Sequence, residues 1–273
     1  MRTEVYETMR TIAIINLKGG VGKTTTAINM AAILAKQGRR VLAIDADPQA
    51  NLSEFFGMTD ELRNTLYGLL EGLSDDPYDF LYGTGVEGIT ILPASIDLIT
   101  ADIASVREGG NVKCIAGLLE ALEEDARAAE GAEEVYPAAR AFDYVLIDCP
   151  PSFTAASVAA IYAADEIVIP VELDAFSVHG MVEVLKQIES VRKIQPRVRV
   201  AGVLITKWRN TPAAVQAEAV LRASAVPVFE AVIRYSPKAA ESTYKAQSLE
   251  DYSRTSAAAR DYRRFVAEYL GVD

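Results

Sequence analysis

A glycine-rich run near the N-terminus contains two lysines. Lys18 precedes the glycines of the run, and Lys23 follows them. Residues 18–25 read KGGVGKTT. Glycines let backbone N–H groups converge on an anion, and a helix that starts in such a loop turns its positive end toward the same anion. The run is therefore a candidate phosphate-binding loop. It consists of Lys18, Gly19, Gly20, Val21, Gly22, Lys23, Thr24 and Thr25.

The flanking residues place this loop between a strand and a helix. Residues 11–16 (TIAIIN) form an apolar run typical of a buried strand, and residues 24–37 are helical in pattern. In a strand, loop and helix of this kind, Lys23 meets the β- and γ-phosphates and the Thr24 hydroxyl binds Mg²⁺. The common phosphate-loop pattern has a glycine where this chain has Leu17. The loop is therefore of a deviant form, in which Lys18 is the signature.

Three segments together resemble the ParA family of partition ATPases, the deviant Walker A proteins of the ParA/MinD superfamily. The first is the loop, in which Asn16 precedes the signature lysine as in the ParA branch. Residues 41–51 (VLAIDADPQAN) resemble the second ParA motif, and residues 144–152 (YVLIDCPPS) resemble its Walker B segment. The likeness covers nearly the whole chain. It implies an ATPase that uses ATP and Mg²⁺, weak alone and stimulated by a partner.

Two of these segments are apolar runs that end in an acid. That pattern is typical of parallel strands buried on both faces, whose carboxyl ends open onto a ligand crevice. We expect Asp148 to bind Mg²⁺ through water, because Mg²⁺ keeps several of its waters. The resemblance implies that Asp45 orients the attacking water, and Asp47 is a further candidate for the metal site or a switch. The alternative is that Asp45 and Asp47 only cap the turn before Pro48.

The outer lysine of the loop requires a role of its own, since Lys23 already occupies the β/γ position. In the ParA family this lysine reaches across a dimer interface to the partner's phosphates, as an arginine finger does. The resemblance therefore implies an ATP-sandwich homodimer whose catalytic residues are Lys18, Lys23 and Asp45. The alternative for Lys18 is a solvated loop lysine.

The apolar runs along the chain predict the fold class. Of the 273 residues, 50% are hydrophobic and 24% are charged, which is ordinary for a globular protein. Six apolar runs alternate with helical stretches, which predicts a single α/β domain over residues 1–273 with a doubly wound, mostly parallel sheet flanked by helices. Residues 57–87 fit no regular pattern and no function. The six expected strands are 11–16, 40–45, 88–92, 143–148, 166–171 and 199–205.

The ends of the chain bear on two further expectations. Residues 1–10 precede the first expected strand and are too few for a helix-turn-helix, so we do not expect sequence-specific repression. Near the C-terminus, residues 260–270 carry an apolar helical stripe with Arg263 and Arg264 beside it. MinD proteins end in an amphipathic membrane helix, so a MinD-like membrane-cycling regulator is the alternative function. We expect the stripe to pack on the protein core instead.

Charge is distributed unevenly between two parts of the chain. The formal net charge is −11, from 27 basic and 38 acidic residues. Residues 186–264 hold 15 basic and 7 acidic residues, a net of +8, which leaves 12 basic and 31 acidic residues elsewhere. An acidic body with a basic C-terminal third can bind DNA through one face.

Four residues are candidate DNA contacts, because their placement resembles that of basic residues in ParA proteins. They are Lys207, Arg209, Arg234 and Lys238. This chain lacks the usual Pro-Arg-Asn run of the family and has residues 233–235 (IRY) instead. Each residue has a solvated surface role as its alternative. Lys207 has a second alternative, a place near the adenine.

The resemblance also implies partners. The ATP state is expected to bind nonspecific double-stranded DNA and a ParB-like adaptor, with a plasmid, a chromosome or another cargo left open. The absence of an 18-residue apolar stretch and of a signal pattern predicts a cytoplasmic protein, with a membrane partner unlikely. The resemblance implies that the protein is nucleoid-associated in the ATP state. An ATPase coupled to redox chemistry would need a cysteine pair at the dimer axis. Cys114 and Cys149 have no metal-site spacing, and we expect Cys149 to pack in the interior.

Overall fold

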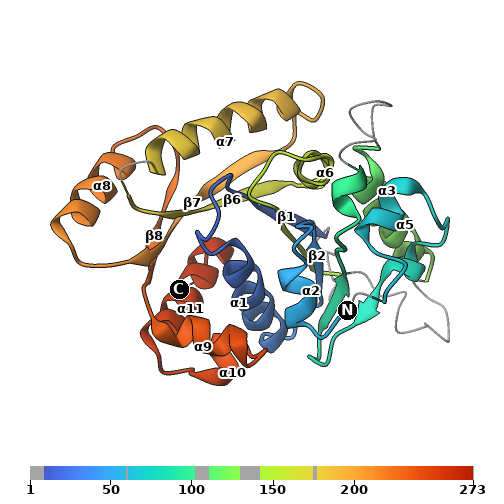
Figure 1. The fold of residues 1–273 in the computed structure, drawn as a ribbon, viewed down its shortest axis with the longest axis horizontal. Coiled ribbons are helices and arrows are strands. Elements are labelled where there is room, and N and C mark those ends of the chain that lie inside the picture. The colour runs from blue at the N-terminus through green and yellow to red at the C-terminus, as the bar shows by residue number, and fades with distance from the viewer. Residues whose placement is uncertain (1–8, 60, 102–110, 130–141, 175–176, 273) are drawn as a thin grey trace, which may run out of the picture.

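The computed structural model describes residues 9–59, 61–101, 111–129, 142–174 and 177–272. Within these residues the chain forms one eight-stranded sheet with the order β3-β4-β2-β5-β1-β6-β7-β8 (Figure 1). All neighbouring strands are parallel except the edge pair β3 and β4. The strands are β1 (Arg10–Ile14), β2 (Val41–Asp45), β3 (Tyr82–Gly83), β4 (Ile89–Leu92), β5 (Tyr144–Asp148), β6 (Glu166–Glu172), β7 (Arg199–Trp208) and β8 (Val228–Arg234).

The central strands are apolar on both faces because helices cover both sides of the sheet (Figure 1). In β2, Leu42 and Ile44 pack into one core, whereas Val41 and Ala43 pack into the other. The first core lies under α3 (Leu66–Glu71), α5 (Cys114–Ala128), α6 (Ala155–Ala163), α7 (Ser177–Arg192) and α8 (Pro212–Arg222). The second lies under α1 (Lys23–Lys36), α2 (Asn51–Phe55), α9 (Pro237–Tyr244), α10 (Leu249–Tyr252) and α11 (Ala257–Leu270).

The six expected strands correspond to β1, β2, β4, β5, β6 and β7, which confirms the doubly wound α/β fold. β8 is not among them, because its buried residues alternate with exposed ones such as Glu230 and so form no continuous apolar run. The irregular segment 57–87 contains α3, a 3₁₀ helix η1 (Pro77–Phe80) and the short β3. Residues 1–8 of the expected extension lie outside the described residues.

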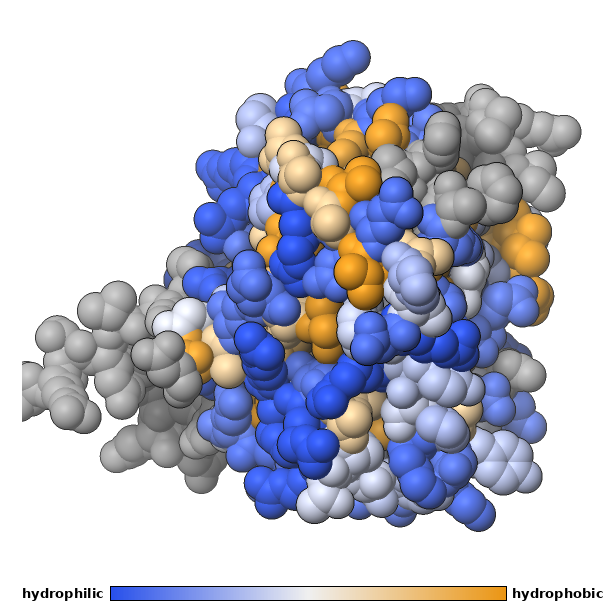
Figure 2. Space-filling model, turned by 90° about the vertical axis from the view of Figure 1, so that its left-hand side faces the viewer, coloured by the Kyte–Doolittle hydropathy of each residue, from blue (hydrophilic) through white to orange (hydrophobic). Residues whose placement is uncertain are grey.

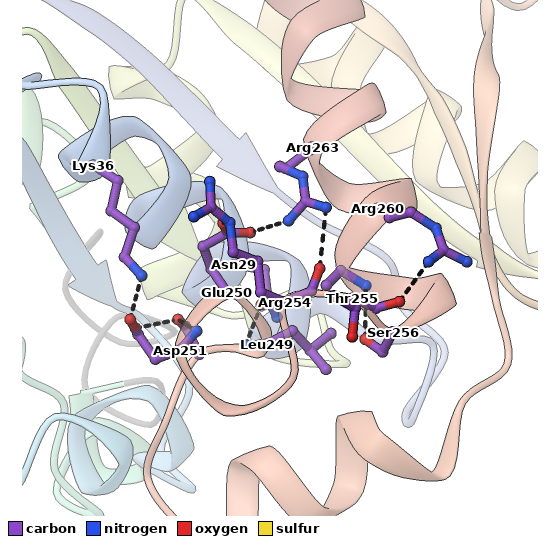
Figure 3. A network of polar contacts seen from close by, with 12 residues as sticks. Asn29, Lys36, Leu249, Glu250, Asp251, Arg254, Thr255, Ser256, Arg260 and Arg263 are labelled. Carbon is purple, nitrogen blue, oxygen red and sulfur yellow. Dashed lines mark hydrogen bonds and ion pairs between the residues drawn. The ribbon is translucent and has the colours of Figure 1, made fainter.

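A polar network fastens the C-terminal elements to α1 (Figure 3). The Leu249 N–H donates to Asn29 Oδ1 over 2.8 Å, and Lys36 forms an ion pair with Asp251. Glu250 is buried, yet its carboxylate accepts from Arg254 Nε at 2.8 Å and from Arg263 at 2.5 Å. Because each oxygen of Glu250 has a cationic partner, its burial is compensated.

The apolar stripe of α11 packs on the core, as expected from the sequence. Tyr262, Phe265 and Val266 are buried, and the Phe265 ring meets Phe229 edge to face at a centroid distance of 5.0 Å. Among the described residues, no helix is long and apolar enough to cross a bilayer.

The molecular surface on the side of α8 contains both hydrophobic and hydrophilic residues. α8 lies at the left of Figure 1, and Figure 2 views the molecule from that side. Hydrophobic residues gather there in a band surrounded by hydrophilic ones (Figure 2). Val215 and Val220 of α8 are among the exposed hydrophobic side chains.

Candidate nucleotide site

The glycine-rich loop connects β1 to α1 at the carboxyl edge of the sheet. Gly20 and Gly22 have φ angles of 74° and 89°, in the left-handed region that favours glycine. A Cβ on Gly20 would meet nothing within 4 Å, so its backbone conformation, not lack of space, requires a glycine there. Gly22 is the N-cap of α1, and the first turn of α1 therefore faces the loop with its positive end.

Contacts from distant strands hold the loop in this shape. Asn16 donates from Nδ2 to Pro170 O in β6 over 2.7 Å, and its Oδ1 accepts from Lys18 N at 3.0 Å. Thr206, near the end of β7, donates from Oγ1 to Val21 O over 2.7 Å. The loop backbone is thus tied to two strands that lie more than 140 residues further along the chain.

The two strand-end acids lie side by side. Asp45 of β2 is the register partner of Asp148 of β5, and Ile14, just before the loop, is the partner of Asp148 on its other side. Both carboxyl groups are buried. The topology therefore brings the three motifs together at one edge of the sheet.

Asp45 is held by donors from α2 and from the turn that precedes α2. It accepts from Ser53 N at 2.8 Å and Ser53 Oγ at 2.7 Å, and from Asp47 N at 3.1 Å. Burial raises the pKa of Asp45 to about 6, and the Ser53 hydrogen bonds act in the opposite direction. Asp47 accepts from Gln49 N at 3.0 Å. Both acids thus make turn-capping contacts, while Asp45 also stands beside Asp148.

Asp148 is buried, and Lys23 and the Thr24 hydroxyl lie near enough to favour its ionised form without forming a hydrogen bond to it. Neither of its carboxylate oxygens has a hydrogen-bond partner among the described residues. Burial raises the pKa of Asp148 well above its usual range and Asp45 adds to this, while the Thr24 hydroxyl and Lys23 oppose it. A buried carboxylate without donors is costly, and the waters of a Mg²⁺ ion are donors of the required kind. The residues therefore fit a water-mediated Mg²⁺.

Lys23 lies inside the loop, where it is buried. Its Nζ donates to Lys18 O over 3.2 Å. Burial lowers the pKa of Lys23, and Asp148, Cys149 and Asp47 oppose that shift. A phosphate bound in the loop would supply the charge that a buried ammonium needs.

Protein ligands alone do not form a metal cage at this site. Within the parts of the chain that the structure describes, no group of three or more His, Cys, Asp or Glu side chains could hold a metal ion. Mg²⁺ is commonly held by one or two protein groups together with nucleotide phosphates and water. Thr24 and Asp148 fit that manner of binding.

Lys18 points away from this interior. Its Nζ forms an ion pair with Asp174, which lies two residues beyond the end of β6. Both side chains are partly exposed, whereas Lys23 is buried. The two lysines of the loop therefore have different surroundings.

The four candidate DNA contacts fall into separate environments. Lys207 has a φ of 50°, and its Nζ contacts Gly20 O of the loop and lies 3.6 Å from Glu172. Lys207 therefore lies beside the phosphate loop, and its expected place near the adenine stays a prediction. Arg209 is exposed and stacks on the Tyr235 ring, 3.9 Å from its centroid.

The other two candidates carry counter-charges. Arg234 binds Asp261 through two side-chain hydrogen bonds of 2.8 Å and 2.6 Å. Lys238 Nζ lies 2.6 Å from Glu241 and also faces the Tyr252 ring. Their charges are therefore partly neutralised within the protein.

Three residues at the site were not anticipated from the sequence. Thr206 could have been noticed, because it directly follows the expected strand 199–205 at a strand end. Ser53 and Asp174 carry no motif signal, since their contacts with Asp45 and Lys18 depend on the folded chain.

Both cysteines are buried, and neither forms a disulfide. Burial raises the pKa of Cys114 to about 12, and it also raises the pKa of Cys149 well above its usual value. Such thiols stay protonated at neutral pH, and protonated thiols are poor metal ligands. Their positions agree with the expected packing role of Cys149.

The fold and the phosphate loop define a P-loop ATPase, and comparison with known proteins supports this class. A family model described as an AAA domain matches residues 9–200. The chromosome-partitioning ATPase Soj of Thermus thermophilus is 37% identical over 265 residues, covering 96% of each chain. The chromosome partitioning protein ParA of Caulobacter vibrioides is 34% identical, over 96% of this chain and 94% of the relative.

A solved structure supports the fold. The structure of cobyrinic acid a,c-diamide synthase from Mycobacterium smegmatis with bound ADP and magnesium has a TM-score of 0.78 and 29% identity. The match covers 96% of this chain and 94% of that one. The chain belongs to the ParA family of partition ATPases.

Proposed function

We propose that this protein is a partition ATPase whose ATP-bound homodimer binds nonspecific double-stranded DNA. In this cycle two copies sandwich two Mg·ATP, and a ParB-like adaptor stimulates hydrolysis, which releases the DNA. The cycle positions or segregates a plasmid, a chromosome or another cargo. In the ATP state the protein is associated with the nucleoid.

The observation that carries the nucleotide part is the unpartnered Asp148 beside Lys23 at the phosphate loop. A buried acid without donors and a buried lysine are each stabilised when a metal–phosphate group lies between them. Mg²⁺ supplies stabilisation of the charge that develops during phosphoryl transfer. In this proposal Asp45, whose carboxylate is held by Ser53, positions the attacking water near that group.

The dimer part is supported by the outward position of Lys18. Lys23 already lies within the loop, so a second lysine on the outer edge is available for another protomer's nucleotide. A cation supplied in trans stabilises transition-state charge only in the assembled dimer, which couples hydrolysis to assembly.

The DNA part is supported by the net charge of +8 in residues 186–264. Among the described residues, Arg209 is the candidate of the four that has no ion pair. Phosphate contacts of this kind give binding without sequence preference and with a strong salt dependence. The acidic remainder of the chain is a suitable surface for a basic segment of an adaptor.

The test is binding to random-sequence duplex DNA at several salt concentrations, with no nucleotide, ADP or ATP. The Asp45→Ala variant holds the ATP state, because it removes the group that orients water. We expect salt-sensitive binding in ATP alone, without sequence preference. Equal binding in every nucleotide state, or none in any, would contradict the proposal.

The MinD-like alternative would require α11 to leave the core, where Phe265 and Val266 are buried.

A further inference from the structure

We propose that Asp174 is a positioning residue that holds Lys18 on its own protomer and so sets the ATP concentration at which the dimer forms. The inference rests on the proposed sandwich dimer, in which Lys18 acts on the partner's nucleotide. It assigns a role to the segment that follows β6.

The first step is the geometry of the acidic segment. Glu172 ends β6 and Asp174 lies two residues further, and each holds a lysine at the outer edge of the phosphate loop. Asp174 pairs with Lys18, and Glu172 lies 3.6 Å from Lys207, which itself contacts Gly20 O. One short segment therefore restrains both cations beside the loop.

The second step is that the Lys18 backbone is fixed while its side chain is not. Its N–H donates to Asn16 Oδ1 at 3.0 Å, and its carbonyl oxygen accepts from Lys23 Nζ at 3.2 Å. The amino group is held by Asp174 in a pair whose members have exposed side-chain fractions of 36% and 41%. Lys18 can therefore change partners by side-chain rotation alone, with no rearrangement of the loop.

The third step is the size of the effect. An exposed ion pair shifts an equilibrium by about 1.4- to 5-fold. Formation of a symmetric dimer releases two such pairs, one on each protomer, so the factor enters twice. Removing the Asp174 charge should therefore strengthen ATP-dependent dimerisation by about 2- to 30-fold.

The chain offers a matched control in the ion pair of Lys36 and Asp251 (Figure 3). It has the same residue types and similar exposed fractions, 46% and 44%, and it lies at the other end of α1. Asp174→Asn and Asp251→Asn remove the same charge from comparable surroundings. Only the first is expected to change dimerisation.

The first measurement is the reactivity of individual lysines toward an amine-acylating reagent, read by mass spectrometry on the nucleotide-free protein. Asp174→Asn should raise labelling of Lys18 severalfold and leave Lys36 unchanged, and Asp251→Asn should do the reverse. Asp174→Glu should restore the wild-type pattern. Unchanged Lys18 labelling in Asp174→Asn would overturn the inference.

The second measurement is the dimer fraction by sedimentation over a series of ATP concentrations, with each variant combined with Asp45→Ala. Asp174→Asn should dimerise at lower ATP than Asp45→Ala alone, and Asp174→Glu and Asp251→Asn should not. Asp174→Asn could raise the labelling of Lys18 and yet dimerise at the same ATP concentration as Asp45→Ala alone. In that case the threshold role is overturned and the proposed function stands. If no protein dimerises in ATP, the proposed function falls, and the threshold role with it.

Discussion

The two ends of α1 have opposite surroundings. At the C-terminal end, the groups that meet α10 and α11 are paired: Lys36 with Asp251, and Glu250 with two arginines (Figure 3). At the N-terminal end, Asp148 is buried without a donor, and the loop contains two left-handed glycines.

This difference separates stability from function within one helix. Paired groups stabilise the fold, whereas unpaired buried groups destabilise it unless a ligand completes them. The polar network at the C-terminal end of α1 (Figure 3) therefore holds the helix in place. At the N-terminal end, the polar groups of the loop remain available to bind the nucleotide.

The largest expected effect is a loss of ATP binding at the loop end of α1. Lys23→Ala should weaken ATP binding by about 100-fold or more, because a desolvated ammonium–phosphate contact is lost. Lys36→Ala, the same change at the other end of α1, should leave ATP affinity unchanged. Titration calorimetry measures both, and near-wild-type affinity in Lys23→Ala would refute the phosphate-loop assignment.

The outer lysine gives the next effect. Lys18→Ala should bind ATP with near-normal affinity yet fail to dimerise or to hydrolyse, with turnover lower by about 100-fold, in the range of a lost trans cation. Sedimentation and phosphate release measure the two properties. An ATP-dependent dimer with normal turnover in this variant would exclude the trans role.

Substitution of one carboxylate near each end of α1 tests the contrast between the two ends through the free energy of unfolding. Asp148→Asn should raise the free energy of unfolding of the nucleotide-free protein by about 1–2 kcal/mol, since a carboxylate whose ionised form is destabilised by burial and by Asp45 is removed. Glu250→Gln should lower it by about 1–3 kcal/mol, since two arginines lose their partner. Denaturant unfolding measures both. Opposite signs would support the contrast between the ends of α1, and equal signs would refute it.

The pH dependence sharpens this prediction. The pKa of Asp148 is raised in the folded protein, so the wild-type folded state binds an extra proton and gains stability as pH falls through that raised pKa. The advantage of Asp148→Asn should therefore shrink as the pH is lowered from 8. An advantage that grows on acidification would show that Asp148 is not the cause.

The smallest effect concerns the DNA face. Arg209→Ala should reduce the slope of log binding constant against log salt by about 1, and Lys238→Ala by less, because Glu241 already neutralises part of its charge. Binding of random duplex DNA in ATP measures both slopes. Identical slopes in all three proteins would exclude Arg209 as a phosphate contact.

The sequence predicted which strand ends meet at one edge of the sheet because its signals are local. The loop and the acids Asp45 and Asp148 each end or follow an apolar run, and parallel strands necessarily bring such ends together. β8 was not predicted from apolar runs, because an edge strand alternates exposed and buried residues. The ion pair of Lys18 with Asp174 joins residues 156 positions apart, and no spacing rule reports such a contact.

The contacts that tie the loop to β6 and β7 have a consequence for how the chain can be divided. Every nucleotide motif lies before residue 153, yet Asn16 is anchored on Pro170 and Val21 on Thr206. A fragment that ended before β6 would contain all the motif residues but would lose the anchors that order their backbone. Such a fragment would have to order the loop on binding, at a cost in conformational entropy that the full chain has already met in folding.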